Sequence, residues 1–156
     1  MPELNAASLQ AALSRIRSQG IKACRTGLIG AADAVVKQAR TNATNGSHAW
    51  GTPTPARPGA GPAVISGTLK NSITREAVVR NPVGWTTKVG LQPGRTPPYG
   101  NHPTESSKYG LYLETGLRNG ATYPFLGPAA KMAGIQANVT FSQAFAVTSW
   151  TTDTTD

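Results

Sequence analysis

The chain has 156 residues, of which 38% are hydrophobic, 17 are glycine and 12 are proline. This length fits a single domain with a modest core and a large share of loop. The formal charge of +8 suits contact with nucleic acid, an anionic membrane or an acidic protein, although a solvated basic surface explains it equally well.

The basic residues are unevenly placed along the chain. Residues 1–104 contain 12 Lys/Arg and three acidic residues, whereas the remainder has a net charge of −1. The single cysteine excludes an internal disulfide and a metal site built from cysteines. No apolar run approaches the ~18 residues of a membrane span, and the first residues lack the pattern of a signal peptide, so neither is expected.

Two helices are predicted at the start of the chain. Residues 5–18 form the first, since apolar side chains recur at steps of four and three. Gly20 is the predicted break, and the second helix runs from about residue 21 to residue 42. Cys24 lies on the apolar stripe of the second helix, which indicates a small buried hydrophobe rather than a reactive thiol. The stripe of the first helix comprises Leu9, Leu13 and Ile16.

The next segment, residues 43–63, has no periodicity and is rich in proline and glycine. A compact domain rarely keeps so long a loop without a function or disorder. Trp50 and Arg57 within it suggest a segment that docks on a partner, the alternative being a loop with no such role.

A short helical turn and two strands are predicted to follow. Ser66 or Thr68 can cap a turn that places Leu69 and Ile73, four residues apart, toward the core. Residues 73–80 and 85–91 then read as an antiparallel hairpin, joined by the turn sequence Asn-Pro-Val-Gly at residues 81–84. Residues 92–106 form a second irregular loop.

The stretch from Tyr109 to Ala130 is the densest aromatic and aliphatic part of the chain. A short amphipathic segment ends at Glu114-Thr-Gly, and a Pro-Phe-Leu-x-Pro turn leads into a final helix. That helix is predicted to begin near Pro128, where proline is favoured in the first turn, and to end near Phe145. One side of the helix is predicted to contain Ala129, Met132, Ile135 and Val139. Residues 148–156 are expected to form a flexible tail.

No catalytic or metal-binding pattern is apparent in the sequence. His48 and His102 lie in predicted loops without neighbouring carboxylates, which favours solvated histidines over ligands. Glu76 and Glu114 are the only acids deep inside predicted elements, and Glu114 is expected to pair with an arginine, in its own chain or across a subunit boundary. The protein is therefore expected to have no enzymatic activity, no cofactor and no metal.

Three segments carry a resemblance to a known family. They are an Ala-rich basic helix (Gly30-Ala-Ala-Asp-Ala-Val-Val-Lys-Gln-Ala-Arg40), the segment Ser66-Gly-Thr-Leu-Lys-Asn-Ser-Ile73, and Tyr109-Gly-Leu-Tyr-Leu-Glu-Thr-Gly116 followed by Pro124-Phe-Leu-Gly-Pro-Ala129. Their order and spacing resemble the HK-ninety-seven-type phage morphogenesis family, the gp-ten-like neck or tail-completion proteins of long-tailed phages. The chain departs from that pattern at Gly110, where alanine is common, and at Leu117, where threonine often follows the glycine.

The resemblance implies an α+β subunit with one domain over residues 1–147, comprising two N-terminal helices, a small antiparallel sheet, a short helix and a C-terminal helix. It implies a non-enzymatic virion protein of the neck that is made in the host cytoplasm. Such subunits form a ring, commonly sixfold, that joins the head to the tail and lets DNA pass without sequence-specific contact. The implied partners are other copies of the chain, head-completion or connector proteins, and tail terminator or tail tube proteins, with no membrane involved.

The resemblance, together with the apolar anchors, also assigns structural and interface roles. Glu114 and Arg118 are expected at the contact between subunits, and the loops 43–63 and 92–106 at neighbouring rings. The complete set of expected interface or structural residues is Leu69, Ile73, Tyr109, Tyr112, Glu114, Arg118, Pro124, Phe125, Leu126 and Pro128. A tail terminator or minor tail protein remains the alternative, and a non-specific DNA-binding protein a more remote one.

Overall fold

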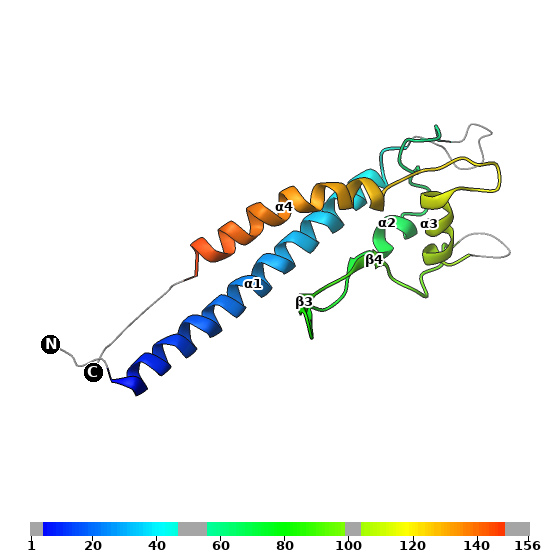
Figure 1. The fold of residues 1–156 in the computed structure, drawn as a ribbon. Helices are drawn as coiled ribbons and strands as arrows, with labels where there is room; N and C mark the ends of the chain where they lie inside the picture. The colour runs from blue at the N-terminus through cyan, green and yellow to red at the C-terminus, as the bar shows by residue number, and fades with distance from the viewer. Residues whose placement is uncertain (1–4, 47–55, 99–103, 149–156) are drawn as a thin grey trace.

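The computed structural model describes residues 5–46, 56–98 and 104–148. The fold is α+β, as predicted. Two long helices, α1 (Ala6–Asn42) and α4 (Leu126–Ala146), run side by side in opposite directions, and the short elements lie along the C-terminal half of α1 (Figure 1). These elements are α2 (Thr68–Ser72), α3 (Ser106–Thr115), β1 (Ile73–Arg75), β2 (Val79–Asn81), β3 (Gly84–Thr86) and β4 (Val89–Leu91).

The prediction of two separate N-terminal helices is wrong, because α1 continues without interruption through Gly20. A glycine inside a helix costs only about 1 kcal/mol relative to alanine, and the residues around it are compatible with a helix. The helix begins at a side-chain cap, where Asn5 Oδ1 accepts a hydrogen bond of 2.8 Å from the Ser8 N–H. One continuous rod of 37 residues results, about 55 Å long at 1.5 Å per residue.

Small residues make the contact between α1 and α4. A Cβ atom at Gly27 would lie 2.6 Å from the ring of Phe141, and one at Gly30 would lie 3.2 Å from Thr140. The Thr140 hydroxyl donates a hydrogen bond of 3.2 Å to the Gly27 carbonyl. The two helix backbones can approach closely because glycine and alanine occupy the facing positions.

The predicted core face of α4 is only partly correct. Ala129 is fully buried, but Met132, Ile135 and Val139 are 44%, 61% and 47% exposed. The side of α4 next to α1 includes the buried Ala144 and the ring of Phe141, whereas Met132, Ile135 and Val139 are turned outward. Helix α4 also begins at Leu126, two residues before the predicted start at Pro128.

The predicted hairpin is present and is divided into two short ladders. β1 pairs with β4 and β2 pairs with β3, both antiparallel. Between them, the Glu76 N–H donates to the Lys88 carbonyl over 2.8 Å, and the Thr87 hydroxyl donates to the Glu76 carbonyl over 2.7 Å. The connecting turn falls at residues 81–84 as predicted, with the Asn81 side chain accepting from the Val83 N–H.

The core lies where α1, α2, the β1–β4 ladder and the start of α4 meet. Ile73 and Phe125 are its largest fully buried apolar side chains. Leu69 is also buried, so both apolar residues predicted to face the core from the α2 segment do so. The buried cluster comprises Val36, Ala39, Ala43, Leu69, Ile73, Phe125 and Ala129.

The first predicted loop leaves this core and returns to it. An isolated bridge joins Gly46 to Ala63, and a Cβ at Gly61 would overlap the carbonyl oxygen of Asn42, so the close approach requires glycine there. Trp50 and His48 lie outside the described residues. The same is true of His102 in the second loop and of residues 149–156 in the predicted tail.

Candidate assembly surface

The junction between α3 and α4 is organised by the carboxylate of Glu114. Glu114 Oε2 accepts hydrogen bonds from the N–H groups of Phe125 and Leu126 at 2.9 and 3.1 Å, and Oε1 accepts from the Gly127 N–H at 2.6 Å. The first N–H groups of a helix have no partner within it, and they carry partial positive charge that attracts a carboxylate. Glu114 therefore caps α4 from the preceding helix.

The residues around this cap leave space for the Glu114 carboxylate and hold the connecting segment in place. A Cβ at Gly127 would lie only 2.8 Å from Glu114 Oε1, so a side chain there would compete with the shortest of the three bonds. The Tyr123 N–H also donates to the Leu113 carbonyl over 2.6 Å, which holds the connecting segment against α3. The Glu-Thr-Gly and Pro-Phe-Leu-Gly motifs thus form one structural unit.

This geometry gives Glu114 a capping role that the sequence did not predict, while its expected pairing with an arginine of another subunit stays a prediction. Its half-buried carboxylate bonds three backbone N–H groups of its own chain, and no ion pair with an arginine is formed within the described residues. Arg118 lies three residues beyond α3 and is exposed. Contact of Arg118 with another subunit stays a prediction.

The other predicted residues divide between core and surface. Phe125, Leu69 and Ile73 are buried, as already described. Tyr109, Pro124 and Leu126 are partly buried beside them, and burial raises the pKa of the Tyr109 hydroxyl, an effect partly offset by a hydrogen bond with the backbone of Leu69. Tyr112 and Pro128 are exposed. Of the ten residues, three are therefore buried, four including Glu114 are partly buried, and three including Arg118 are exposed.

Polar tethers hold the sheet and the junction onto α1. The Arg40 guanidinium donates from Nε and Nη2 to the Ile73 carbonyl at 3.2 and 2.8 Å. Asn42 Nδ2 donates to the Phe125 carbonyl over 3.0 Å. Together these bonds fix the α1 C-terminus against both core segments.

Two further contacts hold the hairpin along α1. Arg75 Nε lies 2.6 Å from Asp33 Oδ1, and the Arg25 guanidinium lies 4.9 Å from the centre of the Trp85 ring. A cation over an aromatic face is attracted to it. Two basic side chains of α1, Arg25 and Arg40, thus contact groups of their own chain.

Large aliphatic side chains are the main feature of the surface that the sequence did not predict. Leu9, Leu13 and Ile16 are 49%, 58% and 43% exposed on the part of α1 that extends beyond the end of α4 (Figure 1). The stripe on α4 described above is exposed as well. Single exposed apolar residues are normal, but contiguous groups of them indicate a contact surface.

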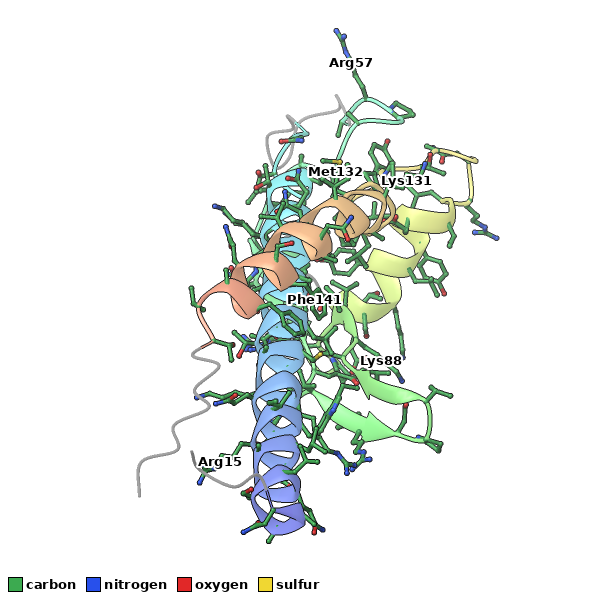
Figure 2. The ribbon with its side chains drawn as sticks, turned by 60° about the vertical axis from the view of Figure 1, so that its left-hand side comes forward. Arg15, Arg57, Lys88, Lys131, Met132 and Phe141 are labelled. Atoms are coloured by element: carbon green, nitrogen blue, oxygen red, sulfur yellow. The ribbon has the colours of Figure 1, made fainter. Side chains whose placement is uncertain are left out.

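The sequence did contain a signal for this arrangement. The α1 stripe continues directly into the glycines and alanines that face α4, so one helix face changes from large to small residues near Gly20. That change coincides with the end of the region covered by α4 (Figure 2), where Arg15 marks the projecting end. The small residues of this face contact α4, and the large residues are exposed.

A shallow cavity of about 430 Å³ lies on the surface and is lined in part by basic residues. It is lined by Asp33, Lys37, Arg40, Thr41, Thr44 and Lys70. Its three cations could contact a phosphate, although Arg40 is already engaged with the Ile73 carbonyl and Asp33 offsets part of the charge.

Within the described ranges, no group of three or more His, Cys, Asp or Glu could hold a metal ion. In the same part of the chain, no helix combines the length and apolarity needed to cross a bilayer. Cys24 is free and only partly buried on α1. No family model, curated protein or solved structure matches the chain.

Proposed function

We propose that the protein is a structural virion component of the head–tail junction, a neck or tail-completion subunit that assembles into a ring between the DNA-filled head and the tail. The observation that carries this proposal is the placement of large aliphatic side chains on exposed faces of both long helices, while the residues of α1 that face α4 are small. A chain arranged in this way leaves apolar surface for neighbouring subunits to bury.

The packing of the second and third segments that carry the resemblance supports the same assignment. Ser66–Ile73 supplies Leu69 and Ile73 to the core, and the Pro124–Ala129 segment supplies Phe125 beside them. The Tyr109–Gly116 segment forms α3 and caps the start of α4 through Glu114. The segments that resemble the family are separate in the sequence but pack together in the structure. This packing is expected if the segments specify the fold of that family.

The proposed ring would be made in the host cytoplasm and then occupy the neck of the virion. Its partners would be further copies of the chain, commonly six in all, head-completion or connector proteins on one side, and tail terminator or tail tube proteins on the other. DNA would pass through the ring without sequence-specific contact. The tethers of Arg25, Arg40 and Arg75 to the chain's own groups support the view that part of the basic charge serves protein contacts rather than the DNA.

Inactivation of the gene in its phage tests this proposal. The expected result is an accumulation of DNA-filled heads and complete tails that do not join, and purified protein added to the lysate should restore infectious particles. Joined particles at normal yield would contradict the proposal. Tails of abnormal length in the same lysate would favour the alternative, a tail terminator or minor tail protein.

Non-specific DNA binding is the second candidate, and the cavity lined by Lys37, Arg40 and Lys70 is the observation that favours it. Binding that depends on neutralised phosphates weakens steeply as salt rises, with a slope that counts the contacts. Titration of random duplex DNA at several salt concentrations would measure that slope. A Lys37→Ala, Lys70→Ala double variant should lower the slope by about two if this cavity contacts phosphates.

A further inference from the structure

One face of α1 follows a regular alternation of steps of four and three over six turns. Steps of this kind keep side chains on one side of a helix and are typical of a seam that packs against another helix. The residues on the seam are Leu9, Leu13, Ile16, Gly20, Ala23, Gly27 and Gly30. At Gly27 and Gly30 the seam meets Phe141 and Thr140 of α4, so its C-terminal half is a helix–helix contact within the chain.

The N-terminal half of the seam has no such cover within the described residues. Ala23 is 1% exposed, but Leu9, Leu13 and Ile16 are about half exposed. Helix α4 ends at Ala146, and α1 extends past that end by several turns (Figure 1). The same seam therefore continues beyond its intrachain partner, now with leucine and isoleucine in place of glycine and alanine.

The charge of α1 limits what can cover the seam. Between residues 6 and 32 the helix contains Arg15, Arg17, Lys22 and Arg25 and no acidic residue. Pairing of this half with the same half of another copy would bring two sets of like charges together, and such pairs are destabilising on adjacent helices. A surface with few positive charges is a better partner.

The exposed apolar stripe of α4 is a surface with few positive charges. Met132, Ile135 and Val139 stand at steps of three and four, and all are exposed. Lys131 is the only charged residue in the whole helix. A cavity of about 290 Å³ lies beside this stripe and is lined by Val35 and Lys37 of α1 as well as Met132. Figure 2 shows Met132 and Lys131 on the half of α4 far from Arg15.

We infer that the Leu9–Leu13–Ile16 stripe of one copy packs against the Met132–Ile135–Val139 stripe of a second copy. The two stripes lie on different parts of the same molecule, and in a heterologous contact each copy uses one stripe toward each of two neighbouring copies. Contacts of this class repeat from copy to copy and close into a ring when the rotation permits. The inference rests on the proposed function, because it names the subunit contact of the proposed ring.

Cysteine pairing between two differently tagged chains tests the contact directly. Both chains contain Cys24→Ala, one also contains Leu13→Cys and the other Ile135→Cys. After mixing and mild oxidation, the expected product is a disulfide between the two different chains, formed at least tenfold more than with Ala11→Cys in place of Leu13→Cys. Ala11 is an exposed residue on the opposite face of α1.

Two results of this experiment would overturn the inference. A disulfide formed only between two Leu13→Cys chains would show that the α1 halves pair with each other. Absence of any product above the Ala11→Cys control would show that something else, such as the chain's own C-terminal residues, covers the stripe.

The mass of Leu13→Glu and Ile135→Glu variants, measured by light scattering, gives a second and independent readout. The dissociation constant of the assembly should be at least tenfold higher for each of these variants than for the unmodified chain, whereas Ala11→Glu should leave it unchanged. Circular dichroism should show that all variants remain helical. Rings that persist in both glutamate variants would overturn the inference and leave the proposed function standing. If the mixed disulfide forms but inactivation of the gene still yields joined virions, the contact is supported and the proposed function is overturned.

Discussion

Replacement of Glu114 tests the reasoning about the α3–α4 junction most sharply. Its carboxylate satisfies three N–H groups at the start of α4, at 2.9, 3.1 and 2.6 Å. A single capping bond contributes about 1 kcal/mol, and hydrogen bonds to charged groups contribute about 1.5–3 kcal/mol. The three bonds share one partly exposed carboxylate and are not additive, so Glu114→Ala is expected to lower the free energy of unfolding by about 2–3 kcal/mol.

Urea denaturation followed by circular dichroism measures this loss. Glu114→Gln keeps one carbonyl oxygen and loses the charge, so it should lose roughly half as much, about 1–1.5 kcal/mol. Glu105→Ala is the matched control, because Glu105 precedes α3 without forming a side-chain cap, and its loss should stay below about 0.5 kcal/mol. A loss below that same level for Glu114→Ala, with an unchanged denaturant slope, would refute the proposed capping role.

Three further predictions concern single residues. Gly20→Ala should raise the free energy of unfolding by about 0.5–1 kcal/mol, since the position is helical with open space around it, and urea denaturation should show the gain. Gly27→Ala should instead lower it by about 1 kcal/mol in the same assay, because the new methyl group would meet the Phe141 ring and backbone, and overpacking outweighs the gain in helix propensity. Burial raises the Tyr109 pKa in the folded state, so the neutral hydroxyl supports folding below about pH 10 and this support is lost as the pH rises further. The stability of the unmodified chain should therefore fall more between pH 8 and pH 11 than that of Tyr109→Phe, and parallel curves for the two proteins would contradict the assignment.

Much of the fold could be predicted because local patterns agree with it. The helical turn before Ile73 and the Asn-Pro-Val-Gly hairpin turn depend on residues close together in the sequence, as does a final helix with proline in its first turn. The expected side-chain cap of the helical turn by Ser66 or Thr68 is not formed, because Gly67 is the N-cap. The error at Gly20 has a physical cause: a glycine weakens a helix only slightly, so it marks a break only where neighbouring residues also disfavour the helix.

The outward orientation of the α4 stripe could not be predicted in the same way. Periodicity identifies one apolar side of a helix, but in α4 two sides are apolar, one with Ala144 and Phe141 and one with Met132, Ile135 and Val139. Which side meets α1 depends on the glycines of α1, some 100 residues earlier in the chain. The role of Glu114 was missed for a similar reason, since its partners are backbone N–H groups that the side-chain sequence does not reveal.

The central claim, that the chain is a ring-forming subunit, is tested most directly by native mass spectrometry of the purified full-length protein, with electron-microscopic class averages of the same sample. The account predicts one closed species of defined copy number, commonly six, that is visible as a ring. A monomer at every concentration up to about 100 µM, well above the range in which specific assemblies form, would contradict it.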